Sequence, residues 1–131
     1  MKRSPRLGLK DRSQAKLDEL FSELIRRRAL ARVGGCERCR TGKTDYKQLQ
    51  CCHIFGRKRR LVRWDPDNAL GMCPGCHMYL DSQPTEMVAF ARQQLGEQGF
   101  LLLEARASQV GKPDIRGLML YYGELLKQME G

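Results

Sequence analysis

Residues 49–77 read LQCCHIFGRKRRLVRWDPDNALGMCPGCH, and this stretch decides the fold. It holds both histidines of the chain, four of its six cysteines and five Lys or Arg within residues 57–63. The pattern predicts a strand over residues 46–54, a basic connection, and a second, short strand over residues 68–72. Residues 74–80 follow as a helix, because proline suits a first helical turn. The sequence therefore predicts an α+β fold built on a small strand–loop–strand–helix unit.

Two Cys-x-x-Cys pairs bracket this unit, and 33 residues separate them. The basic start of the chain leads into no apolar run, so we expect no secretory signal and a reducing, cytoplasmic location. Disulfides are then disfavoured, and four thiolates are the number that a closed tetrahedral zinc site needs. Gly34-Gly35 and Pro74-Gly75 favour the tight turns that bring paired sulfurs together. The sequence predicts a structural Zn²⁺ site whose ligands are Cys36, Cys39, Cys73 and Cys76.

The 131 residues are the length of one domain. Residues 1–10 are predicted to be a flexible basic arm, and residues 11–33 a helix with one apolar stripe. Residues 36–82 form the zinc-braced core, and residues 84–130 form a helical tail. No apolar run approaches the ~20 residues that a membrane span requires, so no membrane partner is expected.

The tail contains two predicted helices and one ambiguous segment. The first helix runs from about Thr85 to Leu95 and stops at Gly96, and residues 100–107 favour helix over strand. Pro113 to Met129 has a clear apolar face and forms the last helix. We expect the apolar faces of the N-terminal and C-terminal helices to pack together, and the alternative use of these faces is a homodimer.

Charge is distributed unevenly along the chain, which has a net charge of +9. Residues 1–83 hold 19 Lys and Arg against 9 Asp and Glu, whereas residues 84–131 hold 5 against 6. A basic half favours a polyanionic partner, with DNA first among the candidates, and the alternative is the solvated surface of a basic protein.

The spacing His53, fourteen residues, Asn68, eight residues, His77 resembles the HNH, or ββα-metal, nuclease motif. The likeness extends to residues 49–58, Arg63 to Asn68, and Cys73 to His77, which are similar to the NinG/Rap group of bacteriophage recombination nucleases. Cys52 stands where that group usually has a small residue. His77 stands where the group commonly has Asn, so it completes the His-Asn-His set.

The resemblance implies catalytic roles for His53, Asn68 and His77. His53 would be the general base, since an imidazole with a pKa near ~6.5 can accept a proton from water at neutral pH. One divalent cation, Mg²⁺ or Mn²⁺, would neutralise the scissile phosphate, with His77 and then Asp65 as its ligands. Asn68 would either join that metal or hydrogen-bond the connecting loop.

Cys52 leaves two alternatives open. A thiolate is a soft ligand that matches Mg²⁺ poorly, so either the site takes a softer ion or Cys52 does not bind the ion. The second alternative is favoured, and Cys51 and Cys52 are then strand residues on alternate faces.

The basic connection is predicted to hold DNA phosphates, and its basic residues are Arg57, Lys58, Arg59, Arg60 and Arg63. Trp64 beside them would either stack on a base or pack under the loop. The resemblance implies a metal-dependent DNA endonuclease of a bacterial or phage-infected cell that acts on branched DNA such as Holliday junctions or D-loops. The alternatives are an HNH nicking or restriction-type enzyme acting on plain duplex, and a zinc-knuckle DNA-binding module without catalysis.

Overall fold

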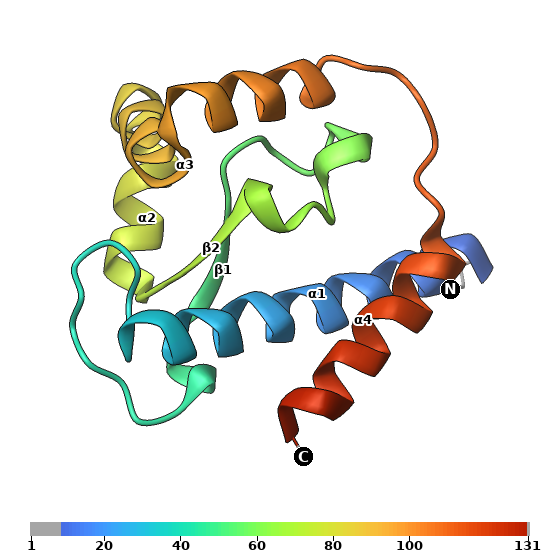
Figure 1. The fold of residues 1–131 in the computed structure, drawn as a ribbon, viewed down its shortest axis with the longest axis horizontal. Helices are drawn as coiled ribbons and strands as arrows, with labels where there is room; N and C mark the ends of the chain where they lie inside the picture. The colour runs from blue at the N-terminus through green and yellow to red at the C-terminus, as the bar shows by residue number, and fades with distance from the viewer. Residues whose placement is uncertain (1–8, 131) are drawn as a thin grey trace, which may run out of the picture.

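A computed structural model of the chain describes residues 9–130, and within them the fold is α+β, with four α-helices and one two-stranded antiparallel sheet (Figure 1). The coarse fold class is therefore as predicted. Residues 1–8 of the predicted basic arm lie outside the described residues. None of the helices within residues 9–130 is long and apolar enough to cross a membrane.

The first helix, α1, spans Leu9–Val33 and ends where the sequence predicts, at Gly34. Gly34 has a φ of 72°, the left-handed conformation that lets the chain leave a helix abruptly. The next residues turn into the first Cys-x-x-Cys pair. The C-terminal end of α1 thus delivers Cys36 to the side of the sheet.

The sheet pairs β1, Gln50–His53, with β2, Ala69–Met72. Gln50 lies opposite Met72, and His53 lies opposite Ala69. The predicted first strand began at residue 46 and is shorter in the structure. Asp45 and Gln48 form a capping box that winds residues 46–48 into a 3₁₀ turn, and this local hydrogen bonding competes with strand pairing.

Helix α2, Pro74–Ser82, follows β2 directly, so the strand–loop–strand–helix unit is present. Helix α3, Pro84–Ala107, bends at Gly96, whose φ of 75° is not helical. The predicted stop at Gly96 is thus a kink, after which residues 97–107 continue as helix. Helix α4, Ile115–Glu130, is the predicted last helix.

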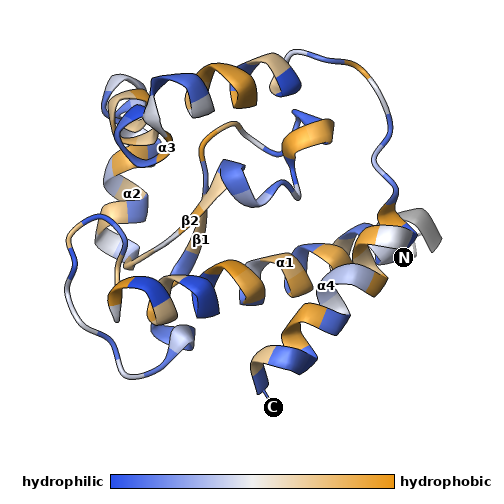
Figure 2. Ribbon diagram, in the orientation of Figure 1, coloured by the Kyte–Doolittle hydropathy of each residue, from blue (hydrophilic) through white to orange (hydrophobic). Residues whose placement is uncertain are grey.

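The two faces of the sheet pack against different helices. One face meets α1 and α4 through an apolar cluster that includes Phe21, Trp64 and Tyr122. The other face meets α2 and the start of α3 through a cluster that includes Cys52, Met72 and Leu80. Figure 2 shows apolar and polar residues alternating along helices α1 and α4.

Close approach of α1 to the sheet depends on Gly71. A Cβ atom at Gly71 would lie 2.5 Å from the Cβ of Ala29, far inside van der Waals contact. Burial of Leu17, Phe21 and Ile25 holds α1 there, and α4 packs on the same side, as the sequence predicts.

Candidate metal centres and the two histidines

Four cysteines, far apart in sequence, gather at one corner of the sheet. The sulfurs of Cys36, Cys39, Cys73 and Cys76 all lie within 4.8 Å of one another. The sulfurs of Cys39 and Cys73 are 3.8 Å apart. A tetrahedral zinc site with Zn–S bonds of about 2.3 Å has sulfur–sulfur edges of about 3.8 Å. The cluster could therefore hold a structural metal such as zinc, on the four ligands that the sequence indicated.

Glu37 fixes the first cysteine pair against the edge of β2. Its backbone amide donates to the carbonyl oxygen of Gly71 over 2.9 Å, and the Gly71 amide donates to the Glu37 carboxylate over 2.7 Å. The Glu37 side chain is buried, with the guanidinium of Arg32 3.8 Å away. Because Gly71 is two residues from Cys73, this docking brings the two cysteine pairs together.

Backbone amides already point at the sulfurs. The amides of Arg38 and Cys39 donate to the sulfur of Cys36, and the amide of Cys76 donates to that of Cys73, each over 3.4 Å. The contact of Cys39 with Thr41 lowers the pKa of the Cys39 thiol to about 6. A thiolate is the form of cysteine that binds a metal, so Cys39 favours binding, whereas burial raises the pKa of Cys76 to about 12 and that thiol must lose its proton when a metal binds.

A second group of ligand atoms lies on the other side of α2. The donor atoms of Cys52, His77 and Asp81 lie within 4.8 Å of one another. The Nε2 atom of His77 is 3.2 Å from the Asp81 carboxylate, and its Nδ1 atom is 2.8 Å from the Gln50 side-chain oxygen. When the ring is neutral and Nδ1 donates to Gln50, the Nε2 lone pair faces Asp81 and Cys52 and is free to bind an ion.

Solvent reaches this second group. A groove of about 480 Å³ is lined by Gln50, Pro74, His77, Met78, Asp81 and Ser82. Cys52 does not line the groove, since the residue is 1% exposed, and burial raises the pKa of its thiol to about 12. The group is thus open on the Asp81 side and closed on the Cys52 side.

Asp81 is the site residue that the sequence analysis missed. It lies four residues after His77, the spacing that places two side chains on one helical face. The predicted helix ended at Leu80, two residues too early, so this signal fell in an expected helix break. The structure continues α2 to Ser82 and brings Asp81 to His77.

His53 lies on the opposite face of β1, against α1. Its Nε2 atom is 2.9 Å from the carbonyl oxygen of Arg63, and its ring centroid is 5.7 Å from that of Phe21. A carbonyl only accepts, so Nε2 carries the hydrogen and Nδ1 is left as a free base. Burial lowers the pKa of His53, which keeps the ring neutral near pH 7.

Asn68 is buried, and its side chain is hydrogen-bonded to the loop that carries Arg63, whose carbonyl oxygen is the partner of His53. Its side-chain oxygen accepts from the Phe55 amide over 2.8 Å. Its side-chain nitrogen donates to the carbonyls of Phe55 and Val62, each over 2.9 Å. Two roles were predicted for Asn68, metal binding and hydrogen bonding to the connecting loop, and the structure shows the hydrogen bonds.

Asp65 has partners other than His77. Its carboxylate accepts from the Arg106 guanidinium over 2.8 Å and from the Asp67 amide over 3.0 Å. It therefore caps the short 3₁₀ helix that precedes β2 and ties it to α3. The carboxylate that lies beside His77 is that of Asp81, which corrects the predicted pairing of His77 with Asp65.

The basic connection separates into free and committed residues. Lys58, Arg59 and Arg60 are exposed, and Arg57 is exposed as well but has its guanidinium 4.0 Å from the Asp18 carboxylate. Arg63, which was predicted to hold phosphate with them, instead makes two hydrogen bonds to Asp18, of 3.1 and 2.6 Å. Trp64 is buried and donates to Asp18 over 2.8 Å, so it packs under the loop.

The two histidine rings thus lie on opposite faces of β1. His53 shares its face with Cys51 and meets Phe21, whereas His77 meets Gln50 and Cys52 on the other face. A comparison of the chain with protein-family models, with curated proteins and with solved structures found no match in any of the three. The function of the chain is therefore inferred from this geometry and from the sequence.

Proposed function

We propose that this chain is a zinc-stabilised endonuclease of the HNH type that hydrolyses DNA with one divalent cation. The observation that carries the proposal is the setting of His53, a histidine whose Nδ1 atom is free to accept a proton. His53 directly follows Cys52, a member of the Cys52–His77–Asp81 group. A pure DNA-binding module has no need of this pairing. The Cys36–Cys39–Cys73–Cys76 cluster holds structural zinc in this proposal.

In-line phosphodiester hydrolysis sets a geometric requirement for this proposal. The attacking water and the leaving oxygen lie on opposite sides of the phosphorus in such a displacement. His53 and His77 lie on opposite faces of β1, so the scissile phosphate would have to bind at the edge of the sheet, with His53 on the side of the attacking water and His77 with Asp81 on the other side. His53 accepts the proton of the water at Nδ1, and its Nε2 hydrogen stays with the Arg63 carbonyl.

A divalent cation bound at the second site would neutralise charge on the phosphate and the leaving oxygen. His77 and Asp81 provide the nitrogen and oxygen donors that suit Mn²⁺, and Asp81 replaces Asp65 in the predicted ligand set. A site that includes the Cys52 thiolate favours a softer ion such as Zn²⁺ over Mg²⁺. The metal preference of the enzyme therefore reports whether Cys52 is a ligand.

Arg57, Lys58, Arg59 and Arg60 hold the DNA backbone in this proposal, because they are exposed and leave β1 beside His53. Each phosphate contact should add about one unit to the slope of log affinity against log salt concentration. Lys58→Ala is expected to lower that slope by about one unit. Lys47→Ala, a change of an exposed lysine before β1, is the control and should leave the slope unchanged.

The test of catalysis is metal-dependent nicking of supercoiled plasmid. His53→Ala should reduce nicking at least ~100-fold, the usual contribution of a general base. Zinc content, melting temperature and DNA affinity should stay near those of the wild type. A wild type that binds DNA but nicks nothing with Mg²⁺, Mn²⁺, Co²⁺ or Zn²⁺ would leave the non-catalytic binder as the function.

The branched substrate is supported by the resemblance of residues 49–77 to the NinG/Rap group. A synthetic four-way junction and a linear duplex of the same length separate the two enzymatic alternatives. Faster cleavage of the junction is expected. Equal rates on both substrates would remove the claim of branch specificity and leave a nuclease acting on plain duplex.

A further inference from the structure

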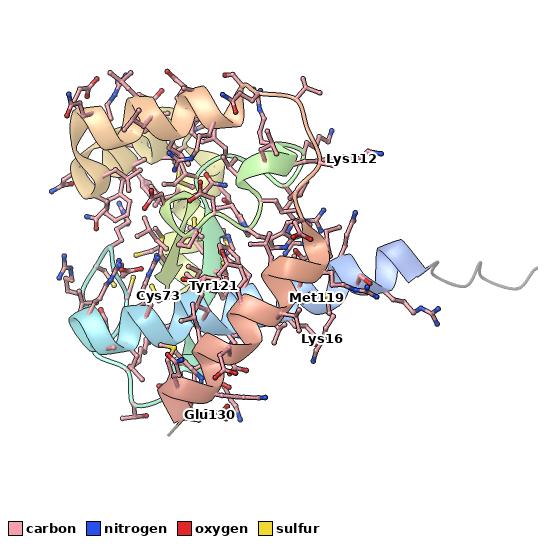
Figure 3. The ribbon with its side chains drawn as sticks, turned by 45° about the vertical axis from the view of Figure 1, so that its right-hand side comes forward. Lys16, Cys73, Lys112, Met119, Tyr121 and Glu130 are labelled. Carbon is pink, nitrogen blue, oxygen red and sulfur yellow. The ribbon has the colours of Figure 1, made fainter. Side chains whose placement is uncertain are left out.

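The outward face of α4 carries apolar side chains that the fold does not use. Leu120 is 72% exposed and Tyr121 is 56% exposed, although both lie in the middle of the helix. The buried residues of α4 are Tyr122 and Leu126, on the side that packs against α1. In Figure 3, α4 lies in front of α1, and Met119 and Tyr121, the neighbours of Leu120, are labelled on it.

Two opposite charges flank Leu120 symmetrically. Arg116 lies four residues before it and Glu124 four residues after it, so both are about 40° of helix rotation from Leu120. Both side chains are exposed. Neither has an ion-pair partner among the side chains that the structure describes, those of residues 12–130.

The surface beside Leu120 is hollowed on the side that faces α1. A hollow of about 440 Å³ beside Leu120 is lined by Ser13, Ile115, Arg116, Met119 and Leu120. Gly123 has no heavy atom within 4 Å of the position that a Cβ would take. Glycine destabilises a helix interior relative to alanine, and no contact among the described residues requires glycine at position 123. Bare backbone at Gly123 does allow a neighbour outside the chain to approach closely.

We infer that α4 is the dimer interface and that its occupant is a second copy of this chain, packed antiparallel about a twofold axis at Leu120. In that arrangement, Arg116 of each copy faces Glu124 of the other, because the two residues are equally distant from the axis. A twofold interface must be complementary to itself, and a positive and a negative charge placed symmetrically about an apolar centre meet that requirement.

The proposal gives the expected strength of association. A helix of 16 residues is about 24 Å long, so one helix pair buries less surface than a permanent dimer does. The dimer should therefore dissociate on dilution. This inference does not depend on the proposed nuclease activity, since the oligomeric state is measured without DNA or added divalent cation.

Sedimentation of the zinc-loaded protein over a range of concentrations tests the surface. The wild type should shift from monomer to dimer as concentration rises, and Leu120→Glu should weaken the dimer at least ~10-fold. Leu102→Glu is the matched control, because Leu102 on α3 is 62% exposed and lies outside the proposed interface. A wild type that stays monomeric, or a dimer that survives Leu120→Glu, overturns the proposal.

A charge exchange tests the antiparallel register. Arg116→Glu and Glu124→Arg should each weaken self-association about 10-fold, because each puts like charges face to face. An equimolar mixture of the two variants should form a heterodimer, in which both charge pairs are complementary again. The double variant should also regain dimerisation. If the mixture associates no better than the separate variants, the pairing of Arg116 with Glu124 is wrong.

Discussion

The two groups of metal-ligating side chains around α2 differ in their chemistry. The four-cysteine cluster has four identical donors, fixed by backbone amides and by the docking of Glu37 on β2. The Cys52–His77–Asp81 group has three different donors and opens into a solvent groove. Structural zinc sites are closed by four protein ligands, whereas catalytic sites keep a position for water or substrate.

The difference teaches that one short helix serves two purposes. Cys73 caps the N-terminus of α2 and Cys76 lies in its first turn, so that end faces the sulfur cluster. His77 and Asp81 lie one and two turns along the helix and face the groove. A metal at the first site would lock the helix that presents the second. Loss of the first site should therefore also remove the second, but not the reverse.

The largest expected effect is that of breaking the closed site. Cys73→Ser should lose the zinc and unfold the chain, because zinc binding at such sites contributes on the order of 10 kcal/mol to folding. Cys52→Ser should keep the zinc and the fold, with a loss of about 1 to 3 kcal/mol from a hydroxyl in an apolar core. Zinc content by mass spectrometry and thermal melting measure both. Equal zinc contents in the two variants would contradict the assignment of Cys73, but not Cys52, to the structural zinc site.

The next effect concerns the loop that holds His53. Asn68→Ala leaves the amide and the carbonyl of Phe55 without partners and removes one of the two hydrogen bonds to the Val62 carbonyl, at a cost of about 3 kcal/mol. Zinc content should not change, because the Asn68 side chain is hydrogen-bonded to Phe55 and Val62 and to none of the four cysteines. Urea unfolding measures the loss of stability.

Asn68→Asp is the control for that change. It keeps the oxygen that accepts from Phe55 but loses the nitrogen that donates to the two carbonyls. Its stability should lie below that of the wild type, and it should also cleave more slowly if the loop positions His53. Stability equal to the wild type in both variants would show that these hydrogen bonds carry little free energy.

Local sequence signals predicted the elements well. The apolar stripe of residues 17–25 and the glycine at 34 defined α1, and Gly96 marked a real break in helical geometry. The spacing of the cysteine pairs predicted the four-sulfur cluster. Each of these signals depends on neighbours in the chain, on helical periodicity or on a tight turn, which is why the sequence alone was sufficient.

The partners of charged residues could not be predicted in the same way. Arg63 pairs with Asp18, 45 residues away, and Asp65 pairs with Arg106, 41 residues away. Arg28 donates to the carbonyls of Pro66 and Ala69. The sequence shows that these residues are charged but not which elements meet, so residues with structural partners were assigned to DNA and to a metal.

A smaller effect is expected at the open site. Asp81→Asn removes one carboxylate from the ligand group but changes an exposed side chain, so stability should change by about 0.5 kcal/mol at most. Affinity for Mn²⁺, measured by calorimetry, should fall at least ~10-fold. Glu86→Gln, which removes an exposed carboxylate outside the group, is the control. Unchanged Mn²⁺ affinity in Asp81→Asn would place the cation elsewhere.

The smallest effect is expected at Tyr122, which joins α4 to the loop behind His53. Its hydroxyl donates to the carbonyl of Trp64, the residue after Arg63, and burial raises the pKa of Tyr122 to about 12. Tyr122→Phe removes one hydrogen bond and should cost about 1 kcal/mol at pH 7. Urea unfolding of both proteins across pH measures the difference.

The pH dependence of that difference has a definite sign. A phenol with a pKa near 10 in the unfolded chain and about 12 in the folded one stabilises the fold fully below pH 10. The contribution is lost as pH rises from 10 to 12, because the unfolded chain releases its proton first. Tyr122→Phe has no such proton, so the wild type should lose its advantage over that range. A constant difference up to pH 12 would mean that the hydroxyl is solvated, and that α4 and the loop behind His53 are not joined there.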